Sequence, residues 1–132
     1  MSNFEPDQLA IASLVGAEVV QVPSTASLQD VAARMNEDGI SAVGVGDETL
    51  VGVITERDIV RAVAIGSDPL TPAIELAETN LFWTDPESTV AEVAEEMMTR
   101  WIRHVFVGQP GNLVGIVSMR DLLVAYVDIA PV

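Results

Sequence analysis

The sequence predicts an α/β fold made of two tandem β-α-β-β-α repeats that pack with pseudo-two-fold symmetry. Residues 52–58 (GVITERD) and 115–121 (GIVSMRD) each lead from β-branched apolar residues into a helix-compatible run, and they lie 63 positions apart. Met35 and Met97, in two earlier helical patterns, lie 62 positions apart. The additional residue falls in a hairpin tip, where insertions are tolerated. The chain therefore contains two copies of one structural unit, and each copy can cover the apolar face of the other.

The first repeat is expected over residues 19–66, after a lead-in at residues 1–18 that contains one short helix. Helical spacing of Leu28, Val31, Ala32 and Met35 follows Ser27, and Gly39 ends the helix. The remaining elements are a strand at 19–22, hairpin strands at 40–45 and 50–54, and a helix from Thr55 to Gly66 with Ile59, Val60, Val63 and Ala64 inward.

A connector rich in turn residues is expected at 67–79, with one helical turn inside it, and the second repeat at 80–132. Ser27 with Asp30 and Thr89 with Glu92 resemble capping boxes at equivalent helix starts. The other elements are a strand at 81–84, a helix from Thr89 with Val90, Val93, Ala94 and Met97 inward, strands at 102–107 and 113–117 around a turn at 108–112, and a helix at 121–127 with Leu122, Leu123 and Tyr126 inward.

The charge balance excludes nucleic acid as a partner. Twenty acidic residues stand against six basic ones, all arginine, for a net charge of −14. No basic surface is available to neutralise phosphates along a duplex. Because such a chain repels itself at low ionic strength and is screened at molar salt, we expect a halophilic protein. An ordinary acidic protein is the alternative, although the absence of lysine argues against it.

Residue counts exclude several kinds of site. There is no cysteine and only one histidine, His104, so thiolate chemistry and multi-histidine metal sites are excluded, and we expect no metal. The N-terminus is acidic, and the apolar run that follows is too short to span a bilayer. The sequence therefore indicates a cytoplasmic protein with no membrane partner.

The doubled motif places a hydroxyl and a carboxylate three residues apart where a strand enters a helix. Thr55 with Asp58 and Ser118 with Asp121 fit a capping box, and the pattern alone favours that structural role. However, a helix N-terminus after a strand also favours anions. Arg57 and Arg120 lie inside the motifs, and positive charge gathered there in an acidic protein indicates an anionic ligand.

The two motifs, the element order and the internal repeat together resemble the CBS domain family. The tandem resembles a Bateman module over residues 15–128, with no catalytic domain attached. The resemblance implies two clefts between the repeats that bind an adenosyl compound: AMP, ADP, ATP or S-adenosylmethionine. No cofactor is required.

The resemblance also implies roles for particular residues. Asp58 and Asp121 correspond to ribose clamps, and Thr55 and Ser118 to their hydroxyl partners. Basic residues at the start of the hairpin contact phosphate in the family, which Arg103 and His104 match and Ser41 and Ala42 do not. Gly44 and Phe106 stand where the family often has proline. The binding set is therefore Val20, Val22, Thr55, Arg57, Asp58, Arg103, His104, Ser118, Arg120 and Asp121.

Some of these residues have a plain structural alternative. Val20 and Val22 line an adenine pocket in the family, but as strand valines they equally fit a core. A single strand histidine such as His104 is more often packed or solvated than bound to a ligand. Met97, Met98 and Trp101 indicate core or a subunit interface.

No nucleophile stands with a base in a recognisable arrangement, so we expect a non-enzyme. The hypothesis is a regulatory, ligand-sensing homodimer that binds an adenine nucleotide and acts on a partner protein. One alternative is a dimerisation or scaffold module with empty pockets that regulates an enzyme or transporter by contact. Another is a regulatory subunit whose site is completed by its partner. If one site holds a phosphate-bearing ligand more tightly, we expect it to involve the second copy.

Overall fold

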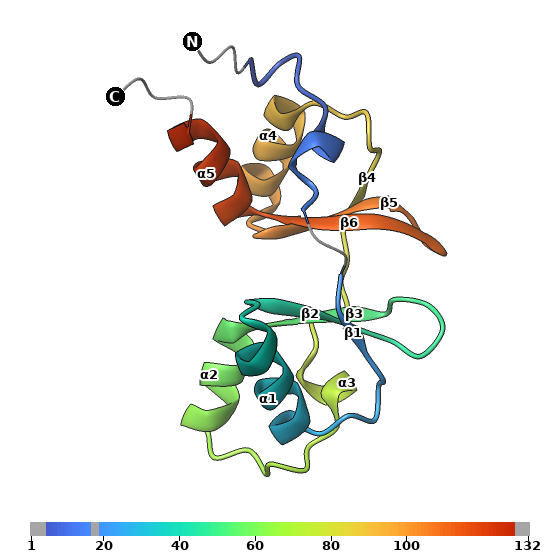
Figure 1. Ribbon diagram of the computed structural model, residues 1–132, viewed down its shortest axis with the longest axis vertical. Coiled ribbons are helices and arrows are strands. Elements are labelled where there is room, and N and C mark those ends of the chain that lie inside the picture. Colours follow the sequence, from blue (N-terminus) through green and yellow to red (C-terminus); the bar gives the residue numbers. More distant parts are fainter. Residues whose placement is uncertain (1–4, 17–18, 129–132) are drawn as a thin grey trace. The chain divides into compact units, whose positions relative to one another are not determined.

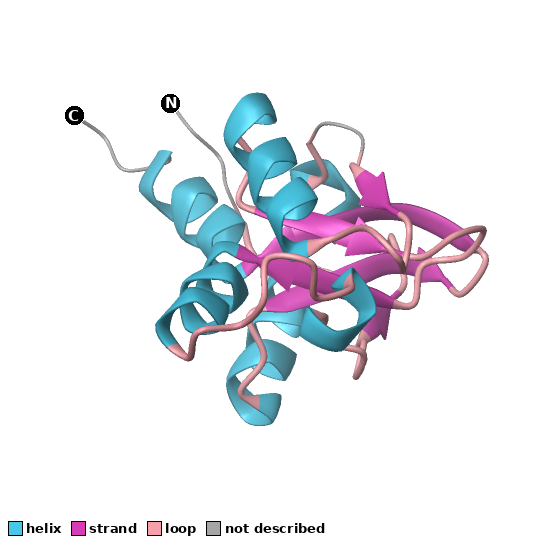
Figure 2. Cartoon of the chain, turned by 90° about the horizontal axis from the view of Figure 1, so that it is seen from below, coloured by secondary structure: helices cyan, strands magenta, loops and turns pink. Residues whose placement is uncertain are grey.

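The computed structural model describes residues 5–16 and 19–128, and its chain divides into two compact units. One unit comprises residues 19–81, and the other comprises residues 82–128 together with residues 5–16. Each has one three-stranded sheet, and its helices gather on one face of that sheet (Figures 1 and 2). The predicted mixed α/β class with two similar sheets is confirmed. The ends of the predicted lead-in (1–4 and 17–18) and of the second repeat (129–132) lie outside the described residues.

The 19–81 unit has the strand order β1-β2-β3. β1 runs parallel to β2, and β2 pairs antiparallel with β3. Its core joins valines of the strands to Val31 and Met35 of the first helix. The elements are β1 (Gln21–Val22), α1 (Leu28–Asp38), β2 (Ala42–Val45), β3 (Gly52–Thr55), α2 (Glu56–Ala64) and α3 (Ala73–Leu76).

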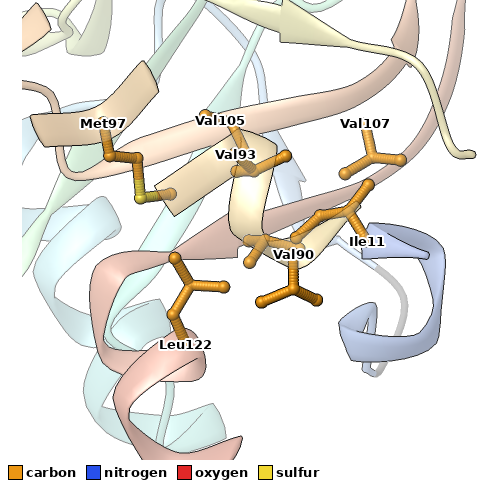
Figure 3. Close-up of a cluster of buried hydrophobic side chains, with 8 residues drawn as sticks. Ile11, Val90, Val93, Met97, Val105, Val107 and Leu122 are labelled. Carbon is orange, nitrogen blue, oxygen red and sulfur yellow. The ribbon is translucent and has the colours of Figure 1, made fainter. Parts of the chain in front are cut away.

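The 82–128 unit repeats this topology in the order β4-β5-β6, with β4 parallel to β5 and β5 antiparallel to β6. Figure 3 shows its core, in which Val93 and Met97 meet strand valines and Leu122. The elements are η1 (Ile11–Leu14), β4 (Trp83–Thr84), α4 (Val90–Arg100), β5 (His104–Gln109), β6 (Asn112–Ser118) and α5 (Met119–Asp128). Among the described residues, no helix is long and apolar enough to cross a membrane.

Each unit is completed by a short segment that docks beside the start of its first long helix. We call these segments leaders: residues 10–15 for the 82–128 unit and residues 72–78 for the 19–81 unit. Ile11 and Ala73, 62 positions apart, are both 0% exposed. Isolated β-bridges join Ala10 to Thr89 and Pro72 to Ser27. The repeat therefore includes the leaders, and the one that completes the 82–128 unit lies at the N-terminus.

The motif glycines allow these leaders to approach the sheet. A Cβ at Gly52 would lie 2.9 Å from Ala77 Cβ and 3.0 Å from the Glu78 carbonyl oxygen. Val53 and Glu78 exchange backbone hydrogen bonds of 3.0 and 2.9 Å at this point. A Cβ at Gly115 would overlap the Val15 side chain. Glycine is thus needed at both positions because another segment packs directly against the strand.

The predicted helix starts are confirmed, with one difference between the two copies. At α4 the capping box is complete: Thr89 Oγ1 accepts from the Glu92 amide at 3.1 Å, and Glu92 Oε1 accepts from the Thr89 amide at 2.8 Å. Hydrogen bonds from the backbone and side chain of Thr89 lower the pKa of Glu92. At α1, Ser27 Oγ accepts from the Asp30 amide at 3.0 Å, but no return bond forms. Ser27 is therefore a simple N-cap.

The prediction was wrong about which apolar residues of α2 and α5 face inward. In α2 the buried residue is Ala62, Ile59 is only partly buried, and Val60, Val63 and Ala64 are exposed. In α5 Leu122 is buried, but Leu123 and Tyr126 are exposed. Each helix buries only one narrow face, so an apolar stripe wider than that face extends onto the surface.

Smaller differences concern lengths. β1 and β4 have two residues each instead of four, and the lead-in helix is a 3₁₀ turn. The predicted turn at 108–112 is shorter, because β5 continues to Gln109 and β6 begins at Asn112. A register shift at Val107/Gly108 and positive φ angles at Gly108 and Gly111 make this tight turn possible.

Candidate functional site

Both motif carboxylates cap the helices that they begin. Asp58 Oδ2 accepts hydrogen bonds from the Thr55 amide at 2.8 Å and from Thr55 Oγ1 at 3.0 Å. Asp121 Oδ2 accepts from the Ser118 amide at 2.8 Å, and Ser118 Oγ accepts from the Asp121 amide at 3.1 Å. The structural role weighed for these pairs is therefore confirmed.

Capping leaves half of each carboxylate available. In the part of the chain that the structure describes, the Oδ1 atoms of Asp58 and Asp121 accept no hydrogen bond. Asp58 is half-buried and Asp121 is exposed. One carboxylate oxygen can thus hold the helix start while the other accepts a hydrogen bond from a ligand hydroxyl.

The sheet register brings the hairpin start beside the motif. His104 pairs directly with Ser118, and Ala42 pairs directly with Thr55. The first helical amide of α5 donates to the Arg103 carbonyl at 2.7 Å. Arg103 and His104 therefore lie next to the second motif, as predicted, whereas the first motif has only uncharged neighbours at the equivalent positions.

The six arginines fall into two groups. Arg34 pairs with Asp38 and Arg100 with Glu96, each at 2.6 Å and one helical turn apart. Arg100 also lies 4.4 Å from the centre of the Phe82 ring. Within the described residues, the side chains of Arg57, Arg61, Arg103 and Arg120 form no ion pair or hydrogen bond, and all four are exposed. Four arginines thus have no carboxylate partner among the described residues, although the chain has twenty acidic residues.

Three of these four arginines lie at the motifs, and Arg61 lies in the last turn of α2. Arg57 and Arg120 occupy the first turns of the two motif helices, and Arg103 immediately precedes the strand that pairs with the second motif. Exposed guanidinium groups next to a helix N-terminus favour an anion with several oxygens, such as a phosphate. The second motif has two of them, with His104 beside it.

Val22 and Val20 lie mainly in the 19–81 core. Val22 is buried among Val43 and Val45, and Val20 packs against the same cluster. A cavity of about 600 Å³ reaches Val22, but its lining comes from α1 and the loop before it, without Thr55 or Asp58. The core role is observed for both valines, and their contact with adenine stays a prediction.

The sheet also places near the second motif two aromatic residues, Trp83 and Phe106, that were not in the predicted binding set. Trp83 of β4 pairs with Phe106 of β5, which pairs with Ile116 of β6. This row of the sheet lies two residues along the strands from the pair His104–Ser118. The 62-position offset aligns Trp83 with Gln21 and Phe106 with Gly44. The presence of aromatic residues in the second repeat, where the first repeat has glutamine and glycine, was the sequence signal that could have identified them.

The CBS domain model matches the chain twice, over residues 11–65 and 73–128. CBS domain-containing protein YhcV of Bacillus subtilis is 32% identical over 109 residues, which cover 81% of this chain and 78% of the relative. Hypoxic response protein 1 of Mycobacterium tuberculosis is 34% identical over 113 residues, covering 83% and 79%.

Among solved structures, CBS domain protein PAE2072 from Pyrobaculum aerophilum, complexed with AMP, superimposes with a TM-score of 0.76. It is 29% identical, and the match covers 91% of this chain and 99% of that one. These matches, with the repeated topology and the doubled motif, lead to one assignment: the chain belongs to the CBS-domain family and carries two CBS domains in tandem.

Proposed function

We propose that this chain is a cytoplasmic, non-enzymatic regulatory module that senses an adenosyl compound: AMP, ADP, ATP or S-adenosylmethionine. The observation that carries the proposal is the set of three exposed arginines without a carboxylate partner, Arg57, Arg103 and Arg120, at the two motifs of a chain with a net charge of −14. The AMP complex of the similar protein PAE2072 supports the same ligand class.

Different residues bind the ribose and the phosphate of the ligand. Asp58 and Asp121 accept hydrogen bonds from ribose hydroxyls through Oδ1, while Oδ2 keeps its capping bonds. Thr55 and Ser118 contribute hydroxyl groups, and Arg57, Arg103, His104 and Arg120 face the phosphate. We assign the tighter phosphate site to the second motif, because Arg103 and His104 have the uncharged counterparts Ser41 and Ala42 in the first.

Sensing requires that the ligand bind one arrangement of the protein better than another. The change would be transmitted to a partner enzyme or transporter. We further propose a homodimer, supported by the exposed apolar stripes of α2 and α5. Val60, Val63, Leu123 and Val127 are each more than half exposed, and an exposed apolar stripe of this kind is typical of an association surface.

A dimerisation or scaffold module is the second candidate, and it is favoured by the fact that both motif aspartates already have a capping role. Calorimetry with the four adenosyl compounds in molar KCl separates the two candidates. We expect at least one compound to bind, and no heat with any of the four would favour the scaffold.

Asp121→Ala should weaken binding of that compound by about 1–3 kcal/mol, because a charged hydrogen bond is lost. Asp121→Asn is the matched control for folding, since its amide oxygen can still accept from the Ser118 amide. Asp58→Ala reports the contribution of the first motif. Unchanged affinity in a folded Asp121→Asn or Asp121→Ala protein would show that Asp121 is only a cap.

A further inference from the structure

The face of the β4–β6 sheet that carries Ser118 also carries an aromatic pair. His104 pairs with Ser118, and two residues further along the ladder Phe106 pairs with both Ile116 and Trp83. Residues two apart on a strand, and residues directly opposite each other, point to the same face. Trp83 and Phe106 therefore share a face with His104 and Ser118.

The two rings form a tilted pair in which one member is accessible. Their centroids lie 5.6 Å apart with an interplanar angle of 44°. Phe106 is 1% exposed, whereas Trp83 is only partly buried. Phe106 thus packs beside Trp83 on the same face of the sheet, and the indole keeps accessible surface. Contacts of this kind between aromatic rings hold an indole in a defined position.

The first unit cannot offer this arrangement. Gln21 stands in place of Trp83, and its side-chain amide donates to the Gly46 carbonyl at 3.0 Å. Gly44 stands in place of Phe106, and the space where its side chain would begin is occupied by Leu50. The aromatic pair is therefore specific to the unit that also has Arg103, His104 and Arg120.

We propose that Trp83 is the nucleobase platform of the second site, stacking its indole on the purine whose ribose and phosphate are held at Ser118 and Asp121. The inference rests on the proposed adenosyl ligand and adds the residue that holds the base. Trp83 and Ser118 are two strands and two residues apart, which corresponds to roughly 12 Å from the usual strand spacing and rise. An extended nucleoside phosphate covers that span.

Stacking on an aromatic side chain suits every base, because all have π faces. Its contribution here comes from a large indole that is already fixed by Phe106, so little ordering is needed on binding. The platform also explains why the two sites should differ. The second site adds Trp83 for the base and Arg103 with His104 for the phosphate, whereas the first site lacks these residues and has only Arg57 at its motif.

Fluorescence can isolate the platform because the chain has two tryptophans. In a Trp101→Phe background, Trp83 is the only indole, and Trp101 is 93% exposed, so its replacement disturbs no packing. AMP, ADP, ATP and S-adenosylmethionine are titrated in molar KCl, with ribose 5-phosphate as the probe without a base. We expect saturable quenching of Trp83 by at least one adenosyl compound and none by ribose 5-phosphate.

Affinity is then compared by calorimetry between variants at one position. Trp83→Gln, which copies Gln21 of the first unit, should weaken binding of the same compound roughly tenfold. Trp83→Phe should keep most of the affinity, and it also covers the case in which Trp83→Gln fails to fold.

The outcomes separate the two proposals. If none of the four compounds binds the parent protein, the adenosyl function is wrong and the platform falls with it. If a compound binds but leaves Trp83 fluorescence unchanged, or binds a folded Trp83→Gln protein with parental affinity, only the platform is overturned.

Discussion

At the scale of single residues, Trp101 occupies a backbone conformation that the first unit assigns to glycine. Gly39 ends α1 with φ 64° and ψ 36°, and Trp101 ends α4 with φ 57° and ψ 37°. A residue with a Cβ is disfavoured by about 1–2 kcal/mol in this left-handed region. The exposed indole makes little packing to offset that strain, so α4 ends at a local cost in stability.

Trp101→Gly should therefore stabilise the protein by about 0.5–1 kcal/mol, since relief of the strain exceeds the extra freedom of glycine in the unfolded chain. Chemical denaturation followed by circular dichroism measures the difference. Gly39→Ala is the converse control and should destabilise by about 1 kcal/mol. A Trp101→Gly protein no more stable than the parent would show that the indole is held by contacts that compensate the strain.

Local hydrogen bonding explains why the sequence could not distinguish a capping role from a ligand-binding role for Asp58 and Asp121. A carboxylate three residues after a hydroxyl caps a helix whether or not a ligand is present, because both hydrogen bonds are local. The structure confirms the cap and leaves Oδ1 of Asp58 and Asp121 unoccupied by the described residues. Capping and ligand binding are therefore compatible roles for one side chain.

At the scale of elements, the leaders are as much a part of each unit as its strands. Ile11 is buried against α4 and β6 residues, and the Ile11 amide donates to the Ser88 carbonyl at 2.7 Å. Val15 then packs on Gly115, the first residue of the second motif. The N-terminal leader is thus in direct contact with the strand that leads into Ser118.

Gly115→Ala should destabilise the protein by about 1–3 kcal/mol, because the new methyl group overlaps Val15 in a packed site. Combining it with Val15→Ala should recover part of that loss, and the double-mutant cycle measures the coupling. Gly16→Ala is the control, since a Cβ there meets nothing within 4 Å. Additive effects of the two substitutions would contradict the docking of the leader on the motif strand.

At the scale of the whole molecule, charge and apolar surface oppose each other. The net charge is −14, yet 49% of the residues are hydrophobic. The outward stripes of α2 and α5 expose valine and leucine side chains. Repulsion between carboxylates acts against both folding and association, and salt weakens it: the screening length falls from about 10 Å at 0.1 M to about 3 Å at 1 M.

The thermal midpoint should therefore rise between 0.1 M and molar KCl, by about 3–4 °C for each kcal/mol of stability gained in a chain of 132 residues. Circular dichroism measures the midpoint, and light scattering should find the mass of two chains in molar KCl. A variant with Glu37→Gln, Glu48→Gln and Glu95→Gln, all at exposed positions, should show a smaller salt dependence. Equal midpoints at both salt concentrations would rule out salt adaptation.

Local patterns in the sequence were sufficient for the element order, the repeat, the helix starts and the position of the motif. Helical spacing around Met35 and Met97 and the cap at Thr89 depend on residues within one or two turns, so they can be read without a fold. The placement of Arg103 beside Ser118 followed from the hairpin, which is also a short-range feature.

Only the tertiary structure decided which surfaces meet. It assigned the N-terminal leader to the 82–128 unit, turned Val60 and Leu123 outward, and placed Trp83 on Phe106. It also left four arginines without carboxylate partners among the described residues. These outcomes depend on contacts between residues far apart in the chain, where packing and not local preference determines the partner.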